Sequence, residues 1–489
     1  MSAVSYKLDD LFSVKRLTEH EKNKDGRPIA SLSSFLLDYQ KIIYSSAFRR
    51  MLDKTQVFPL EEYDYVRTRL THSIEVECIS EEIISKVCMH IKELKNKKDD
   101  AKLIIRCASL IHDIGNPPFG HYGEEVIRNY FKNSIDYHVI SKHVVEKLKL
   151  SSYNLRDALG EKITDFTKFD GNAQGFRVVT NLQRNDSFES GLNLTSGVLG
   201  SIIKYPYSSM NAVGEKFGYF QSEKKFIDFL LKDGSLIENI ENPFAVLLEC
   251  ADDIAYIVSD LDDAVNKNVI NYEIFQNELK QKLEQEKDEH LSDFSSMFCK
   301  FYEKNKTLKN GFEISMKALV NYLKNKLIFA CVAKAIEKET LININKSIFD
   351  DVKENGFRFE TREGEQASSG PMKNLISFVK HIIKKYLYTD RNIVLLELEG
   401  ENVLNFLITE FIDCVLKLDL DDLNSPNNSL HDLKLYSLIS ESVKKSYYDS
   451  KEENKTDDIY YRIRMVIDFI SGMTDNYSKR LYSYLKGIK

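Results

Sequence analysis

The residues best suited to chemistry lie within 111–125, where two histidines and several carboxylates flank a bend rich in glycine and proline. The apolar run before it, 103–111, predicts a mostly buried helix that delivers His112 and Asp113 at its C-terminal end. The Gly-Asn-Pro-Pro run at 115–118 ends that helix, because proline lacks an amide donor and clashes with the preceding turn. An imidazole and an adjacent carboxylate can bind the same cation if the helix axis points past that cation, so this stretch is the candidate reaction centre.

Helical spacing places His121 and a third histidine, His72. His121 and Glu124 are three residues apart where the next helix is expected to begin, so both can lie on one face. His72 lies four residues before Val76, the first member of an apolar stripe, and therefore faces inward, with Arg69 one turn earlier on the same side. An inward histidine standing alone is more often a satisfied core residue than a ligand, so His72 becomes a candidate through its partners.

An apolar stripe predicts a third helix over residues 247–261. This helix carries an acidic edge along one side. Asp252, Tyr256 and Asp260 succeed one another at four-residue intervals along this edge, and they could simply form an acidic solvent face. Asp252, however, sits between apolar residues of a helix that is expected to be buried. An unpaired carboxylate there would cost several kcal/mol, so Asp252 needs a partner, and a cation is the simplest one.

These side chains make up a set of metal ligands. His72, His112, Asp113 and Asp252 supply two imidazoles and two carboxylates, which suit Mn²⁺, Fe²⁺, Zn²⁺, Co²⁺ or Mg²⁺ and leave positions open for water and substrate. A remote His, then His-Asp, then a remote Asp resembles the pattern of the HD-domain phosphohydrolases. An HD dipeptide alone occurs by chance in many chains, whereas four positions in this order on inward-facing helices are far more specific.

The composition favours an all-α protein with at most small strand pieces. The chain has 489 residues, 43% hydrophobic and 29% charged, with 8 Pro and 20 Gly, which suits one large or two fused domains. We expect an N-terminal arm over 1–35, an HD-domain helical core over 36–340, and C-terminal helices over 341–489 that complete the site and make oligomer contacts. Residues 38–52 are predicted to form one helix, 129–180 a loop with short apolar pieces, and 355–371 a mobile loop or hinge.

Cysteine usage and net charge limit which cellular compartment and which kinds of ligand are expected. Seven scattered cysteines without a CxxC pair indicate a reducing cytoplasm, so we expect a cytoplasmic protein. The N-terminus has no apolar signal core and the chain has no 18-residue apolar run, so we expect neither export nor membrane insertion. The net charge of −7 repels polyanions, so a polyanionic ligand requires a local cluster of Lys and Arg.

Further motifs resemble those of the bacterial deoxyguanosinetriphosphate triphosphohydrolases and extend over nearly the whole chain. They are SAFRR (46–50), KTQV (54–57), RLTHS (69–73), residues 112–124, GNAQGFR (171–177), KYP (204–206), FQSE (220–223), ADDIAY (251–256) and SGMTD (471–475). Together they are far more specific than the HD pattern, and the chain is identified as a member of this family.

The resemblance implies cleavage of a deoxynucleoside triphosphate at the α-phosphorus, which gives the deoxynucleoside and inorganic triphosphate. The expected substrate is dGTP, with other dNTPs also considered. The expected cofactor is Mn²⁺ or Mg²⁺, with Fe²⁺, Co²⁺ and Zn²⁺ as alternatives, and it would polarise the α-phosphoryl group. The leaving 5′-alkoxide is too basic to depart unprotonated, so an acid is required. His121 matches the catalytic histidine of the family, and Glu124 its acidic partner, which would keep the imidazole charged and aligned.

The resemblance also implies two groups of substrate-binding residues. The phosphates, with about four negative charges, would be held by positions that match Arg69, Lys204, Lys216 and Tyr256. Gln56 and Asp260 match positions that contact the sugar 3′-hydroxyl, and a close approach there would leave no room for a 2′-hydroxyl.

Three alternatives stay open. Another HD phosphohydrolase, acting on guanosine tetraphosphate or a cyclic nucleotide, would share the metal set but would not need His121 with Glu124. A broad dNTPase activated by a second nucleotide would show no separate pattern in one sequence. A non-catalytic nucleotide or single-stranded DNA sensor is opposed by the intact metal and acid positions and by the negative net charge. The resemblance further implies a homo-oligomer, a hexamer or a tetramer, and leaves the base preference, the native metal and the biological role, control of dNTP pools or phage defence, undecided.

Overall fold

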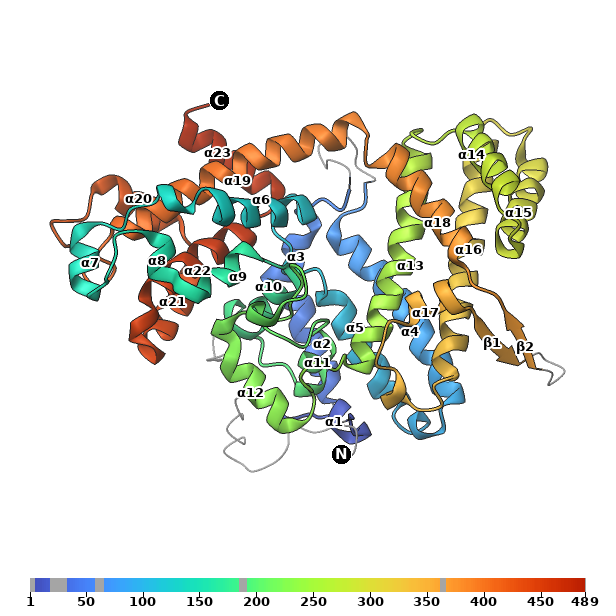
Figure 1. Ribbon diagram of the computed structural model, residues 1–489, viewed down its shortest axis with the longest axis horizontal. Helices are drawn as coiled ribbons and strands as arrows, with labels where there is room; N and C mark the ends of the chain where they lie inside the picture. Colours follow the sequence, from blue (N-terminus) through green and yellow to red (C-terminus); the bar gives the residue numbers. More distant parts are fainter. Residues whose placement is uncertain (1–4, 18–32, 58–65, 184–190, 361–365, 489) are drawn as a thin grey trace.

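The computed structural model describes residues 5–17, 33–57, 66–183, 191–360 and 366–488, which fold almost entirely into helices (Figure 1). The first helices are α1 (Leu8–Leu11), α2 (Ser34–Tyr44), α3 (Ser46–Arg50), α4 (Arg69–His90), α5 (Lys98–Ile111), α6 (Gly120–Asn133), α7 (Lys142–Leu148), α8 (Leu155–Leu159), α9 (Thr164–Thr167), α10 (Gly171–Arg177), α11 (Ser196–Ser201), α12 (Lys224–Asp233) and α13 (Pro243–Asn266). The others are α14 (Tyr272–Gln285), α15 (Glu289–Asn305), α16 (Gly311–Ile336), α17 (Ile348–Asn355), α18 (Lys373–Ile382), α19 (Arg391–Lys417), α20 (Leu430–Leu438), α21 (Glu441–Glu453), α22 (Asp458–Ser471) and α23 (Asp475–Lys486). The all-α prediction is confirmed.

One small hairpin accounts for the named strands among the described residues. β1 (Phe357–Glu360) pairs antiparallel with β2 (Gln366–Ser369), so that Phe357 lies opposite Ser369. The hairpin occupies the stretch 355–371 that was predicted to be a mobile loop or hinge, and its tip, 361–365, lies outside the described residues. The prediction of at most small strand pieces is confirmed.

The helices that carry the candidate ligands begin at clear local signals. The side chain of Thr68 accepts a hydrogen bond from the backbone N–H of Thr71, and the Thr71 hydroxyl oxygen accepts one from the Thr68 N–H, which forms a capping box at the start of α4. Asn242 caps α13 through the N–H of Phe244, with proline at the first helical position, where it has no amide to lose. These caps fix where each helix starts, and therefore which residues face inward.

The structure corrects two local predictions. Residues 129–180 are not a loop, because α6 continues to Asn133 and the short helices α7, α8, α9 and α10 follow. Helices of four to seven residues contain too few apolar positions to show a helical period in the sequence. The helix expected from Asp38 to Leu52 is interrupted at Ser45, whose extended backbone ends α2 and whose hydroxyl accepts from the N–H of Phe48 to begin α3.

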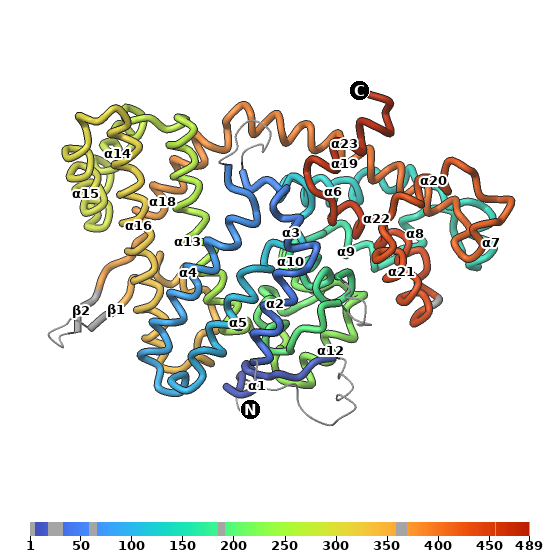
Figure 2. The backbone as a smooth tube through the Cα atoms, turned by 180° about the vertical axis from the view of Figure 1, so that it is seen from behind, coloured from blue at the N-terminus to red at the C-terminus, as the bar shows by residue number. Residues whose placement is uncertain are grey.

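Two hydrophobic cores divide the molecule. The first contains the inward faces of α4, α5, α13 and α16 and includes Ile114. The second joins α6 and the short helices after it to α19 and α22, and includes Phe119. Both views show α6 running beside α19 (Figure 2). The bend at 115–118 is thus where the chain first passes from the first core to the second, and it lies between the candidate ligands and His121.

A buried ion cluster also connects the first half of the chain to the last helices. Arg177, at the end of α10, donates hydrogen bonds of 2.7–2.9 Å to the carboxylate of Asp468 on α22 and one of 2.6 Å to Glu223. All three side chains are at most 2% exposed. Removal of one partner would leave an uncompensated buried charge, which is strongly destabilising, so this cluster ties α10 and α22 together.

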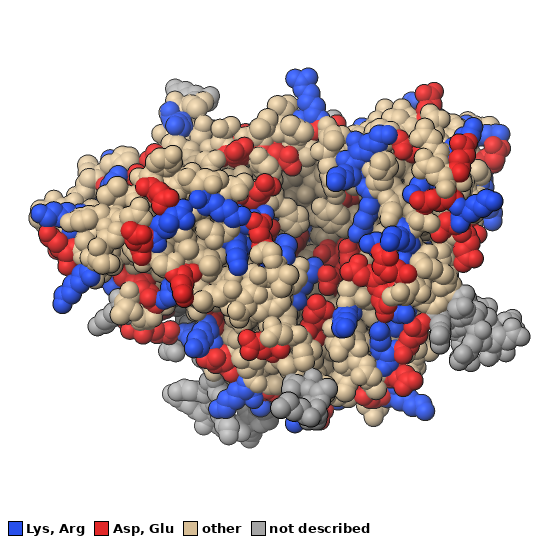
Figure 3. Space-filling model, viewed as in Figure 1, with Lys and Arg blue, Asp and Glu red and all other residues tan. Residues whose placement is uncertain are grey.

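On the face seen in Figure 3, Asp and Glu side chains gather over α13. This concentration of negative charge means that an anionic ligand approaching α13 must be met by a cation or by nearby Lys and Arg. Within the described parts of the chain, none of the helices has both the length and the apolar character needed to cross a membrane.

Candidate metal centre and active site

Three helices bring the four candidate metal ligands to one place. His72 lies on the first turn of α4, His112 and Asp113 follow the last residue of α5, and Asp252 lies in the middle of α13. His72, His112 and Asp113 each offer a ligand atom, and these atoms all lie within 4.8 Å of one another. The Oδ1 atom of Asp252 is 3.0 Å from Nε2 of His72 and 3.6 Å from Nε2 of His112. The set predicted from the sequence therefore converges in space.

The surrounding hydrogen bonds leave the ring nitrogens suited to a metal ion. Nδ1 of His112 donates to the carbonyl oxygen of Ser109 at 2.7 Å, which makes Nε2 the atom with the free lone pair. That Nε2 atom is buried and has no hydrogen-bond partner. Asp113 is oriented from both sides, by Arg69 Nη1 at 2.6 Å and by Asn116 Nδ2 at 2.7 Å. Outer contacts of this kind hold metal ligands in place, so the donor set fits a divalent cation.

The charges at the centre are strongly coupled. Burial alone would lower the pKa of His112, but the carboxylates of Asp113 and Asp252 raise it to about 9. Burial would raise the pKa of Asp252, but His112 and His72 hold it well below its usual range. Two ionised carboxylates that draw positive charge onto an imidazole in this way would favour a bound cation.

The pair of His121 and Glu124 lies on the first turn of α6. Nδ1 of His121 is 3.5 Å from Oε2 of Glu124, and the His121 side chain is 62% exposed, whereas that of Glu124 is 3% exposed. The hydrogen bond and charge of Glu124 raise the pKa of His121. Burial would raise the pKa of Glu124, yet His121 lowers it to about 2. Glu124 thus favours the protonated form of the imidazole, which faces solvent, where a ligand can reach it.

Glu124 is itself fixed by the neighbouring backbone. Its Oε1 accepts a hydrogen bond of 2.9 Å from the N–H of Gly171, the first residue of α10. A Cβ at Gly171 would stand 2.5 Å from that same oxygen, so only glycine allows this approach. The glycine that begins the GNAQGFR motif therefore has a local reason: it lets α10 come close enough to hold Glu124.

The cations predicted to hold phosphates lie around the centre, each beside a carboxylate. Arg69 is buried against Asp113, and its Nε has no hydrogen-bond partner. Nζ of Lys204 is 3.2 Å from a carboxylate oxygen of Glu249, and Nζ of Lys216 is 3.4 Å from one of Asp170. Glu249 lies three residues before Asp252 on α13, and Asp170 precedes Gly171, whose N–H binds Glu124, so both lysines lie near the site.

The residues predicted to contact the sugar come from two sides. Asp260 lies two turns after Asp252 on α13 and is 1% exposed. Gln56 precedes α4, and its side-chain oxygen is buried without a hydrogen-bond partner. The Tyr256 ring stands edge-on to His72, with 6.3 Å between the ring centroids.

Comparison with known proteins agrees with this geometry. Residues 69–167 match the HD domain, and residues 433–484 match the phosphohydrolase-associated domain. A deoxyguanosinetriphosphate triphosphohydrolase-like protein of Listeria innocua is 34% identical over 99% of this chain and the whole of that protein. The deoxyguanosinetriphosphate triphosphohydrolase of Salmonella typhimurium is 31% identical over 96% of this chain and 95% of that protein. The chain belongs to the deoxyguanosinetriphosphate triphosphohydrolase family.

The family that was predicted from the sequence motifs is therefore confirmed. The HD domain and the relatives support a hydrolase that acts on nucleoside triphosphates. The HD domain together with the cluster of His72, His112 and Asp113 indicates that the site binds a divalent metal ion.

The structure brings to Asp260 a residue that sequence reasoning missed. Tyr388 follows a turn of π-helix, Ile383–Leu387, and its hydroxyl donates a hydrogen bond of 2.5 Å to Oδ2 of Asp260. Burial raises the pKa of Asp260 to about 7 in spite of this bond. Tyr388 is 128 residues away from Asp260 in the chain, so no local pattern could have linked the two.

Proposed function

We propose that this protein hydrolyses deoxynucleoside triphosphates, dGTP foremost, to the deoxynucleoside and inorganic triphosphate. One observation supports this reaction above the alternatives: the His121–Glu124 pair stands beside the candidate ligands, since Arg69, which binds Asp113, lies against the backbone of Gly120, the residue before His121. A site that only binds a nucleotide does not need a proton donor next to its metal ligands.

Bond changes in the proposed reaction are those of an in-line substitution at phosphorus. A water oxygen forms a bond to the α-phosphorus, the bond from that phosphorus to the 5′-oxygen breaks, and the water proton passes to solvent. His121 gives its proton to the departing 5′-oxygen, and Glu124 keeps the imidazole protonated until then. A divalent metal ion held by His72, His112, Asp113 and Asp252, with Mn²⁺ or Mg²⁺ favoured, would supply Lewis acidity toward the α-phosphoryl group.

The cations around the site would bind the phosphate chain by changing partners. Lys204 and Lys216 are paired with Glu249 and Asp170 in the free protein, so phosphate oxygens would compete with these carboxylates. The unpartnered Nε of Arg69 and the hydroxyl of Tyr256 complete the proposed phosphate clamp.

We assign sugar selection to Gln56, Asp260 and Tyr388. The buried Gln56 oxygen and the Asp260 carboxylate are both acceptors for a 3′-hydroxyl, and Tyr388 holds Asp260 in place from behind. A buried acceptor that gains a hydroxyl donor is stabilised, whereas a crowded 2′-hydroxyl would be excluded, which favours deoxynucleotides.

The test uses the purified protein with Mn²⁺ or Mg²⁺ and the four dNTPs and GTP, with products resolved by chromatography. We expect inorganic triphosphate and deoxynucleoside, fastest from dGTP, and no product from Asp252→Ala. Release of pyrophosphate or phosphate would contradict the proposed reaction. Turnover of dTTP only when dGTP is added would identify the nucleotide-activated alternative, and binding of single-stranded DNA without turnover would identify the sensor.

A further inference from the structure

The start of α6 depends on a residue with a strained backbone. Phe119, two residues before His121, has φ of 63°, in the left-handed region that a bulky side chain rarely adopts. A non-glycine residue there is strained and persists only when its surroundings hold it. The surroundings of Phe119 therefore help to decide where α6 begins and where His121 points.

One carboxylate from the C-terminal helices holds this turn. Oδ1 of Asp475 accepts a hydrogen bond of 3.1 Å from the N–H of Phe119, and Oδ2 accepts one of 2.9 Å from the N–H of Thr55. Thr55 is next to Gln56, and Asp475 is 3% exposed. A single buried side chain thus joins the backbone that carries His121 to the backbone that carries Gln56.

The Asp475 carboxylate is not used to cap its own helix. The N-terminus of α23 is capped by Thr474, whose side chain accepts from the N–H of Tyr477. An acidic residue at a helix start often only complements the helix dipole. In Asp475 both oxygens instead bind backbone groups about 420 and 356 residues earlier in the chain.

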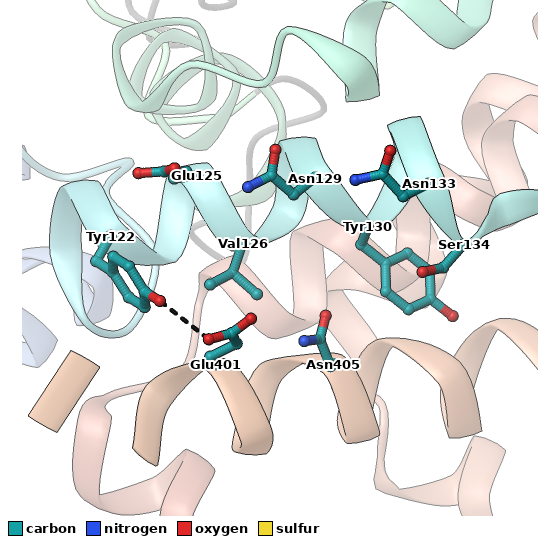
Figure 4. Close-up of a pocket in the computed structure, with 9 residues that line it drawn as sticks. All are labelled: Tyr122, Glu125, Val126, Asn129, Tyr130, Asn133, Ser134, Glu401 and Asn405. Carbon is teal, nitrogen blue, oxygen red and sulfur yellow. Dashed lines mark hydrogen bonds between the residues drawn. The ribbon is translucent and has the colours of Figure 1, made fainter. Parts of the chain in front are cut away.

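A glycine of α19 holds the other side of the same turn. A Cβ built on Gly400 would stand 2.6–2.9 Å from ring atoms of Phe119, closer than carbon atoms approach one another. The Phe119 ring therefore lies directly against the backbone of α19. Further along, the hydroxyl of Tyr122 donates to Glu401 at 3.0 Å, beside a cavity of about 170 Å³ between α6 and α19 (Figure 4).

A buried lysine makes a parallel connection. Nζ of Lys54 donates to the carbonyl oxygen of Asn116 at 2.5 Å and to that of Ser471 at 2.9 Å. Asn116 in turn orients the candidate ligand Asp113. The SGMTD motif at 471–475 thus binds Phe119, just after the bend at 115–118, directly and reaches Asn116, within the bend, through Lys54.

We propose that Asp475 is a positioning residue, and that Asp475 and Gly400 together clamp Phe119 so that His121 and Gln56 keep their places around the substrate. The clamp acts through the backbone and touches neither substrate nor metal. It rests on the proposed function, because its effect is read from the protonation of a 5′-oxygen and from the choice of sugar.

The first test replaces Asp475 by Asn, which removes one of the two acceptors and has nearly the same size. We expect kcat on dGTP to fall by about 10- to 100-fold, because a misplacement of about 1 Å costs that much, with metal content unchanged. An analogue with sulfur as the bridging 5′-atom leaves as a thiolate and needs no acid, so the loss on it should be much smaller. Asp432→Asn, at the first turn of neighbouring α20, is the matched control and should keep the parent rate.

The second test uses the steric contact. Gly400→Ala places a methyl group against the Phe119 ring, so we expect a loss of kcat on dGTP similar to that of Asp475→Asn. Phe119→Leu in the same chain removes the ring and should restore most of the rate, as expected for two residues that act through one contact. Asn402→Ala, an exposed position of α19, controls for a general effect on that helix. A double variant no better than Gly400→Ala would show that this contact does not position His121.

Hydrogen exchange of the full-length protein separates this clamp from the proposed function. Amides of residues 114–126 should exchange faster in Asp475→Asn than in the parent, whatever the reaction. A parent that releases no triphosphate overturns the proposed function, and the exchange result still decides the clamp. Parent-like exchange at 114–126 with parent-like kcat and deoxy-to-ribo preference in Asp475→Asn would overturn the clamp.

Discussion

Asp260 should make the protein less stable as the pH rises, and Asp260→Asn should remove this effect. The carboxyl group is 1% exposed, and its nearest donor is the hydroxyl of Tyr388. Burial raises its pKa from 3.8 to about 7, because a charged carboxylate loses its hydration there. An asparagine has nearly the same shape, can still accept from Tyr388 and never carries the charge.

The sign and size follow from the two pKa values. Between about pH 4 and pH 7 the folded protein keeps a proton on Asp260 that the unfolded chain has lost, so stability falls as the pH rises. A shift of about three pKa units at about 1.4 kcal/mol per unit sets an upper bound of about 4 kcal/mol. Asp260→Asn should therefore gain up to about 4 kcal/mol over the parent at pH 8, and much less at pH 4.

Urea denaturation of parent and variant at pH 4.5, 6 and 8, with a chelator present, measures this difference. Asp253 and Asp263 also have pKa values raised to about 6 by burial, so the comparison of variant with parent isolates Asp260. Asp228→Asn, on the exposed side of α12, is the control for loss of a carboxylate. A gain in Asp260→Asn that is the same at every pH would refute the reasoning, since it would not come from a titrating group.

Three further outcomes are expected. Asp252→Ala should lose turnover and most of its bound metal by elemental analysis, because deletion of a ligand leaves an incomplete shell, and full occupancy would move the fourth ligand elsewhere, most simply to Asp253. Turnover in ¹⁸O-water should label the inorganic triphosphate, and label in the nucleoside 5′-oxygen would show attack at carbon. His121→Asn should lose about 10²- to 10⁴-fold in kcat on dGTP with metal content intact, and much less on the analogue with a bridging sulfur; equal losses on both would make His121 a binding residue.

Much of the site could be predicted because helical spacing carries side-chain direction. His72 was placed on the inward face by its distance from Val76, and it is 1% exposed in the structure. The Gly-Asn-Pro-Pro run placed the end of α5, which ends at Ile111. Both signals are local, because each depends on the backbone geometry of about four consecutive residues.

The parts that could not be predicted depend on contacts between distant segments. Tyr388 reaches Asp260 only because the turn after α18 packs on α13. The SGMTD motif was visible in the sequence, but its contact with Phe119 was not, since the two lie 356 residues apart. The break at Ser45 was missed because a serine is tolerated within a helix and also caps one, and the sequence shows only its presence.

The division into two cores has a consequence for synthesis of the chain. Residues 119–173 of the second core pack on one another and on Phe217 and Phe220, but the segment from 396 onward, which forms the rest of that core, is made roughly 200 residues later. At about 5–20 residues per second, the ribosome takes about 10–40 s to produce it. Throughout that time the face of α6 that will meet α19 stays uncovered in the nascent chain, so chaperones have access to the helix that carries His121, and this candidate proton donor reaches its final place only after α19 has been made.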